Sequence, residues 1–200
     1  LSLYRQASKL ENNAANALRL HRARIRAGKG RKAIRSLAAW HRDHPGNEDI
    51  MSVLADHYVQ AGQRAKGLAL YRALIDADPN NLAAHNNLAL ALLPLDAERA
   101  LASALRAYRL APTNAAVLDT LGWIQVRNGD LEAGLHRLRE ALARAEHVAE
   151  IRYHLAVALE GQGATHEARQ QLHQALQQKK PFMGRADAEQ RLRRLDQSIN

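Results

Sequence analysis

The chain has 200 residues, a formal net charge of +9 at pH 7 and no cysteine. The lack of cysteine excludes disulfides and thiolate metal sites, and no apolar run approaches the ~20 residues that a membrane-spanning helix needs. Apolar residues make up 46% of the chain and aromatic residues only 4%, a balance that favours closely packed helices over a β-sandwich.

The chain opens with LSLYRQASKL, in which no charged segment precedes an apolar one. We therefore expect a fragment or a processed chain whose targeting signal lies outside these residues. The positive charge is concentrated near this end, because residues 1–46 hold eleven of the 29 Lys and Arg residues and two of the 20 Asp and Glu residues. The remainder is balanced in charge, so a general preference for nucleic acid is not indicated.

Helical segments then alternate with turns at a period close to 34 residues. A glycine follows the first segment of four periods, at Gly28, Gly62, Gly129 and Gly163, and a proline follows the second segment of three, at Pro45, Pro79 and Pro112. In one period LLPLDAER, residues 92–99, replaces the glycine turn. The glycines predict the left-handed conformation that ends a helix, and the prolines mark where the second helix stops.

Small residues recur at two positions of each period. The first helices carry a leucine at Leu20, Leu54, Leu88, Leu121 and Leu155, followed by His21, Ala55, Ala89, Gly122 and Ala156. The second helices carry Ala33, Gly67, Ala100, Gly134 and Ala168. Antiparallel helices approach closely where both present small residues, so these positions predict the helix crossings.

Two large residues depart from this pattern. His21 takes a crossing position that is Ala or Gly in the other copies. It could make the contact between the two helices sensitive to pH, or it could mark a loosely packed repeat, and we favour the second interpretation. Trp40 stands where other copies have Leu or Ala on the second helix, and we interpret it as a core residue.

This 34-residue pattern resembles the tetratricopeptide repeat (TPR). The resemblance predicts an all-α TPR α-solenoid, a right-handed superhelix of antiparallel helix pairs that ends in a C-terminal capping helix. We expect the second helix of a partial repeat at 1–13, repeats at 14–47, 48–81, 82–114, 115–148 and 149–182, and the capping helix at 183–200. Because half a repeat is not a cap, we also expect further repeats before Leu1.

Residues 82–178 are also similar to the C-terminal region of the large TPR lipoproteins of the PEP-CTERM/exosortase system, which accompany bacterial exopolysaccharide gene clusters. The similar strings are NNLA (86–89), AYRLAP (107–112), LDTLGW (118–123) and IRYHLAVAL (151–159). Ala89-Leu90 departs from the Ala-Trp that is common there. The resemblance implies a periplasmic or outer-membrane-anchored scaffold for polysaccharide export or protein sorting, and a cytoplasmic TPR adaptor stays open.

Catalytic and metal-binding motifs are not evident. His41 and His44 lie in HRDH and could share a helix face, but no third ligand is close in sequence, so we interpret the segment as a polar helix end. Asp56 and His57 are adjacent on a helix and face different ways, which disfavours a catalytic dyad. We expect neither enzymatic activity nor a cofactor or metal ion.

The first helices of stacked repeats line the concave side of a TPR superhelix. The candidate partner-binding residues there are Arg19, Arg22, Arg26, Asp49, Asp56, Asn86, Asn87, Asp119, Trp123, Arg127, Tyr153 and His154. Asn side chains can bind the backbone of an extended peptide. The three arginines share one helix stripe, which is by default a solvated face and could otherwise meet an acidic upstream repeat, an acidic partner or an anionic polysaccharide.

Trp123 follows the small residue Gly122, so its ring turns away from the crossing. It is either a packing residue between repeats or an exposed anchor for a ligand, and both interpretations remain open. The sequence thus predicts a non-catalytic protein–protein interaction scaffold that binds a partner protein or peptide in a concave groove. The alternatives are a polysaccharide-binding module that uses the basic stripe and a regulatory appendage of an upstream enzyme domain.

Overall fold

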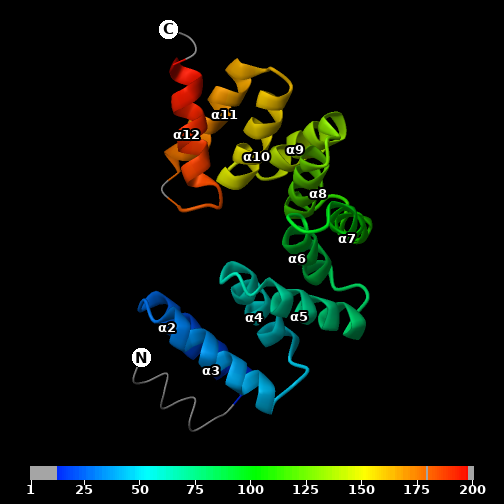
Figure 1. The fold of residues 1–200 in the computed structure, drawn as a ribbon, viewed down its shortest axis with the longest axis vertical. Helices are drawn as coiled ribbons and strands as arrows, with labels where there is room; N and C mark the ends of the chain where they lie inside the picture. Colours follow the sequence, from blue (N-terminus) through cyan, green and yellow to red (C-terminus); the bar gives the residue numbers. More distant parts are fainter. Residues whose placement is uncertain (1–12, 179, 198–200) are drawn as a thin grey trace. The chain divides into compact units, whose positions relative to one another are not determined.

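The structure, a computed structural model, describes residues 13–178 and 180–197 (Figure 1). The first helices of successive pairs are α2 (Ala14–Arg26), α4 (Glu48–Gln60), α6 (Leu82–Leu92), α8 (Ala115–Arg127) and α10 (Ala149–Gly161). The second helices are α3 (Gly30–Asp43), α5 (Arg64–Ala77), α7 (Ala97–Leu110), α9 (Leu131–Arg144) and α11 (Thr165–Gln177), and α12 (Arg185–Gln197) follows them.

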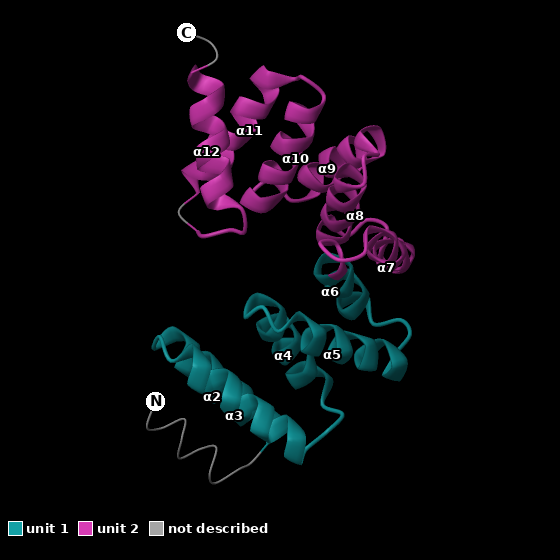
Figure 2. Cartoon of the chain, in the orientation of Figure 1, with its two compact units in different colours: residues 1–91 teal, residues 92–200 magenta. Residues whose placement is uncertain are grey.

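The described residues contain helices and no strand, which confirms the predicted all-α class. The chain divides into two compact units, residues 1–91 and 92–200 (Figure 2). Unit 1 contains α2 to α5 and nearly all of α6, whereas unit 2 contains α7 to α12. The partial repeat predicted at 1–13 lies outside the described residues except for Asn13, which caps α2. Within the described residues, no helix combines the length and hydrophobicity that crossing a membrane would require.

Four turn glycines end the first helices as predicted. The φ angles of Gly28, Gly62, Gly129 and Gly163 are 69°, 76°, 88° and 82°. The turn between α6 and α7 lacks glycine and is closed by hydrogen bonds instead. The backbone N–H groups of Leu95 and Asp96 both donate to the carbonyl of Leu92. The Asp96 side chain then accepts from the Arg99 N–H at 3.0 Å and caps α7. That turn therefore needs no residue in the left-handed region.

An asparagine side chain caps the start of four of the first helices. The side-chain oxygens of Asn13, Asn47, Asn81 and Asn114 each accept a backbone N–H of the first turn, at 2.9–3.3 Å. Three of these residues stand two positions after the proline that ends the preceding repeat. Each such cap contributes about 1 kcal/mol. At α10 the equivalent residue is Val148, which has no side-chain cap.

The predicted helix crossings are confirmed, because the glycines there leave no room for a Cβ atom. A Cβ added at Gly122 would lie 2.9 Å from Leu138 Cγ and 3.0 Å from the Gly134 carbonyl oxygen. A Cβ at Gly134 would lie 2.8 Å from the Gly122 carbonyl oxygen, so α8 and α9 meet glycine to glycine. In unit 1, a Cβ at Gly67 would lie 2.8 Å from the Ala55 carbonyl oxygen.

The interpretation of His21 as a loosely packed position is wrong. His21 is only 3% exposed, and its Nε2 lies 2.8 Å from Nε2 of His57 on the next first helix. Trp40 is partly buried and packs against the core cluster that contains Leu37 and Ile50, as its position predicts. Its ring also stacks on His44, with centroids 4.3 Å apart.

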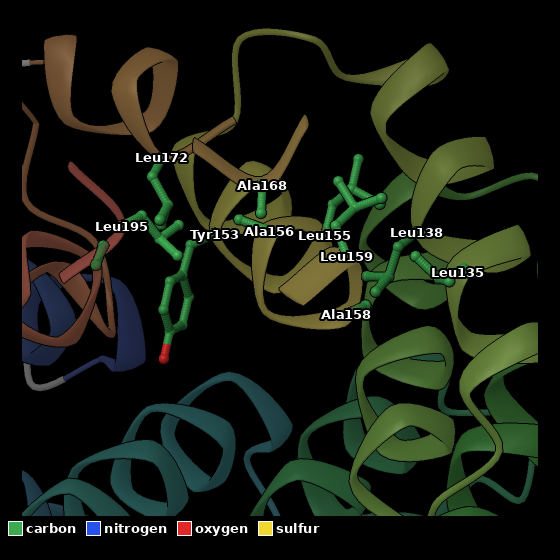
Figure 3. Close-up of a cluster of buried hydrophobic side chains, with 11 residues drawn as sticks. Leu135, Leu138, Tyr153, Leu155, Ala156, Ala158, Leu159, Ala168, Leu172 and Leu195 are labelled. Atoms are coloured by element: carbon green, nitrogen blue, oxygen red, sulfur yellow. The ribbon is translucent and has the colours of Figure 1, made fainter. Parts of the chain in front are cut away.

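Helix α12 covers the last helix pair, in agreement with the expected capping helix. Ala188 and Leu195 of α12 join a core cluster with Tyr153 and Leu172 (Figure 3). Arg191 and Arg194 both form ion pairs with Glu160 of α10. Residues 198–200 of the predicted capping helix lie outside the described residues.

Candidate functional site

Asp56 links three helices of unit 1 through its side-chain hydrogen bonds. It lies on α4 and accepts hydrogen bonds from the Tyr71 hydroxyl and, at 3.2 Å, from Nδ2 of Asn87 on α6. Burial and the Asp56 carboxylate raise the pKa of Tyr71, so this hydroxyl stays a donor. Asn86 lies beside Asn87, and its buried Oδ1 has no hydrogen-bond partner among the described residues. Three predicted residues are therefore brought together, whereas Asp49 is exposed in the first turn of α4.

The predicted arginine stripe is solvent-exposed along α2. Arg19 donates to the Asn16 side chain at 3.2 Å, and within the described part of the chain Arg19, Arg22 and Arg26 form no ion pair. Helix α2 contains four arginines and no acidic residue, so no carboxylate of this helix offsets their charge.

A pocket of about 420 Å³ opens between α2 and α4, both in unit 1. Its lining residues are His21, Arg22, Ile25, Arg26, Val53 and His57. The pocket therefore combines Arg22 and Arg26, which were predicted to bind a partner, with His21 and His57, which were not. A signal for the pair exists in the sequence, because the two histidines stand 36 residues apart, close to one repeat period.

A hydrogen bond joins the two histidines, and it requires that Nε2 carries a proton in one ring and not in the other. Because Nε2 faces Nε2 at 2.8 Å, one ring donates its N–H and the other accepts with a lone pair. Burial lowers the pKa of His21, the Ala33 carbonyl opposes this, and the charges of His57, Arg22 and Arg24 lower it further. Burial also lowers the pKa of His57, against the attraction of Asp56. The neutral pair is thus favoured near pH 7.

In unit 2, Trp123 lies in a cluster of polar and aromatic residues between α8 and α10. His154 Nδ1 is 2.8 Å from Asp119 Oδ1, and the Trp123 ring stacks on the His154 ring with centroids 4.3 Å apart. The Arg127 guanidinium carbon lies 5.5 Å from the Trp123 centroid, a cation–π distance. Burial raises the pKa of the neighbouring Glu150 carboxyl, an effect that His154 opposes and Asp119 reinforces.

Trp123 is partly buried, so it packs between first helices and still has accessible ring surface. The candidate residues Arg127 and Tyr153 both lie near the Trp123 ring, and Asp119 bonds to the His154 ring on which Trp123 stacks. Tyr153 itself is 8% exposed and donates its hydroxyl to Asp187 of α12 at 2.9 Å. Of the candidates in unit 2, Tyr153 and His154 are buried, Asp119 and Trp123 are partly buried, and Arg127 is exposed.

The structure also places the residues considered for catalysis or metal binding. Asp56 and His57 do not pair with each other, as the sequence predicted, because their partners lie on different helices. His44 Nδ1 lies 3.1 Å from the Trp40 carbonyl oxygen at the end of α3, so it is part of a helix terminus. No group of three or more potential metal ligands occurs among residues 13–178 and 180–197.

Two family models, both described as tetratricopeptide repeat, match residues 24–93 and 120–184. No curated protein sequence matches. Among solved structures, a thermophilic TPR protein of Thermus thermophilus is 24% identical, with a TM-score of 0.76, over 89% of this chain and 98% of that one.

Two further solved structures are similar at lower identity. MamA from Desulfovibrio magneticus RS-1 is 17% identical, with a TM-score of 0.64, over 80% of this chain and 92% of that one. YrrB, described as a TPR protein with an unusual peptide-binding site, is 14% identical, with a TM-score of 0.59, over 94% of this chain and 97% of that one. These likenesses show the fold, and the family models place both halves of the chain in one family. The chain belongs to the tetratricopeptide repeat family, whose members generally act as protein–protein interaction scaffolds.

Proposed function

We propose that this chain is a non-catalytic scaffold that binds an extended segment of a partner protein along the faces of its first helices. The observation that carries the proposal is a pair of equivalent side-chain contacts. Asn87 and His154 each stand immediately before a repeat leucine, and each bonds to a carboxylate of the preceding first helix, Asp56 or Asp119. Polar groups at this register connect first helices within each unit, and Asp56, Asn87 and Asp119 remain partly accessible on the faces of these helices.

Trp123 supplies the apolar anchor on this surface. Its ring is fixed by the stack on His154 and the neighbouring Arg127, so little side-chain entropy is lost when a ligand covers it. The indole Nε1 forms no hydrogen bond with a described residue and can donate to a peptide carbonyl. Aromatic groups with an apolar body and a free donor dominate binding hot spots.

The cellular role follows from the sequence strings shared with the PEP-CTERM/exosortase-associated lipoproteins. We propose a role in exopolysaccharide export or envelope protein sorting, at a periplasmic or outer-membrane-anchored location. Deletion of the encoding gene should reduce secreted exopolysaccharide or mislocalise surface proteins, and unchanged secretion and sorting would argue against this role. A tagged full-length protein recovered only from the cytoplasm would argue against the location.

The binding role is tested with peptides selected from a random library on the wild-type chain. Trp123→Ala should weaken the selected peptides by at least ~1 kcal/mol, or about fivefold in Kd. The matched control is Tyr108→Ala, because Tyr108 is also partly buried, also lies near an arginine and belongs to the second helix α7. Equal losses from both variants, or a library that yields no binder, would contradict the proposal.

A polysaccharide-binding module remains the second candidate, since Arg19, Arg22 and Arg26 lack ion-pair partners within the described residues. An anionic polysaccharide such as alginate would then bind in a salt-dependent manner. It would also bind equally well to the Trp123→Ala variant, which separates the two candidates.

A further inference from the structure

We propose that the pocket between α2 and α4 binds a carboxylate side chain of an acidic partner peptide and takes up a proton at its histidine pair when it does so. This inference rests on the proposed function, because the pocket lies between two first helices. It adds a ligand class and a pH dependence that the TPR fold does not specify.

The arrangement of the pocket fits an acid next to an apolar side chain. Arg22 and Arg26 lie one helical turn apart on α2 and provide the cationic side. Val53 and the 40% exposed Ile25 provide apolar wall on the two helices. A peptide presents a carboxylate and an aliphatic side chain within a few residues, whereas an acidic polysaccharide has no aliphatic side chain for these walls. The lining therefore favours a peptide.

The charge of the pocket is not neutralised from within the described chain. The acidic residue of α4 that is adjacent in sequence to His57 is Asp56, which already accepts from Tyr71 and Asn87. Arg22 and Arg26 form no ion pair with a described residue, and guanidinium groups bind carboxylates through short, charge-assisted hydrogen bonds. A carboxylate in the pocket thus gains partners without displacing an existing one.

The histidine pair couples this binding to protons. The groups that face it are Arg22 and Arg24 from α2, the Ala33 carbonyl from α3 and Asp56 from α4. The arginine charges disfavour a proton on the pair in the free protein, and a bound carboxylate offsets those charges. Binding therefore raises the pKa of the pair, so a proton is taken up and affinity increases as the pH falls through the range of histidine titration.

The test uses a fluorescein-labelled, amidated peptide with the core Glu-Leu-Glu-Leu-Glu and a matched peptide in which Gln replaces each Glu. Fluorescence anisotropy is measured with the whole chain at low salt. We expect the Glu peptide to bind at least ~10-fold more tightly than the Gln peptide and its affinity to increase about threefold or more between about pH 7.5 and 6.0.

Two double variants with the same loss of charge locate the site. Arg22→Gln with Arg26→Gln should weaken the Glu peptide at least ~10-fold. Arg31→Gln with Arg35→Gln, which alters exposed residues of α3 outside the pocket, should change its Kd by less than about twofold because only long-range charge is lost. His57→Gln, checked for folding by circular dichroism, should abolish the increase at low pH.

Several results would overturn the inference. These are equal weakening by the two arginine double variants, equal binding of the Glu and Gln peptides, affinity independent of pH, and alginate binding with the same pocket dependence as the peptide. Failure here is distinguishable from failure of the proposed function. Library peptides that depend on Trp123 would still bind in the first case, because Trp123 belongs to unit 2 and the pocket to unit 1.

Discussion

The glycine-to-glycine crossing of α8 and α9 allows a sharp test of the repeat register. In Gly122→Ala the new methyl group would lie 2.9 Å from Leu138 Cγ, 3.0 Å from Arg137 Cβ and 3.0 Å from the Gly134 carbonyl oxygen. Only the side-chain contacts can relax, and the backbone contact requires the helices to separate. Overpacking of this kind costs about 1–3 kcal/mol, and the gain from replacing a helical glycine by alanine returns about 0.5–1 kcal/mol.

With the middle value of each range, about 2 and about 0.75 kcal/mol, the expected net loss is about 1.25 kcal/mol of the free energy of unfolding. In urea, with a slope of about 2–3 kcal/mol per molar for a chain of this size, the unfolding midpoint should fall by about 0.4–0.6 M. The matched control is Gly161→Ala, because its Cβ would meet only Leu131 side-chain carbons at 3.6–3.7 Å. That variant should be neutral or slightly stabilised. A Gly122→Ala chain as stable as the wild type would refute the crossing.

Three further predictions concern a helix cap and two titrations. Asn114→Ala should lower the free energy of unfolding by about 1 kcal/mol in the same urea assay, since two backbone N–H groups lose their acceptor. Folding lowers the pKa values of His21 and His57 below the unfolded value of about 6.5. The stability that the two histidines contribute is therefore present above that pH and is lost as the pH falls below it. Equal urea midpoints at about pH 7.5 and about pH 5 would contradict this. Burial and the bond to Asp187 raise the pKa of Tyr153 to about 12, so the stability that it contributes is complete below pH ~10 and is lost as the pH rises towards that value. The difference between spectrophotometric titrations of the wild type and Tyr153→Phe should show an ionisation at about pH 12, and an ionisation at about pH 10 would contradict this.

The parts of the fold that could be predicted from sequence depend on backbone geometry. A left-handed turn requires Gly28 or its equivalents, and a close crossing requires Gly122 opposite Gly134, so the residue type at these positions is nearly determined. The Asn caps were equally predictable, since Asn114 stands two residues after Pro112 and offers an acceptor to the first turn. They were missed because the repeat was defined by its glycines and prolines.

The contacts of the candidate site could not be predicted in the same way. His21 and His57, or Asp119 and His154, lie about one repeat apart, and whether they meet depends on the rotation and spacing of successive first helices. Small differences in these quantities decide between a hydrogen bond and two solvated side chains. For the same reason the sequence left Trp123 undecided between packing and exposure, and the structure shows a ring that does both.

The departure at His21 supports a functional interpretation of the α2–α4 pocket. Four copies of the repeat place Ala or Gly at this crossing, because a small residue there allows close packing at little cost. His21 replaces that packing with a buried polar ring, which requires a hydrogen-bond partner, and it finds one in a second partly buried histidine. The charges of the neighbouring Arg22 and Arg24 make His21 harder to protonate. Local rules are most often broken where a site needs a group that packing alone would not select. Helices α2 and α4 thus hold the unusual crossing residue His21, the pocket, and Arg22 and Arg26, which form no ion pair with a described residue. The surface between these two helices is therefore the part of unit 1 where binding should be sought first.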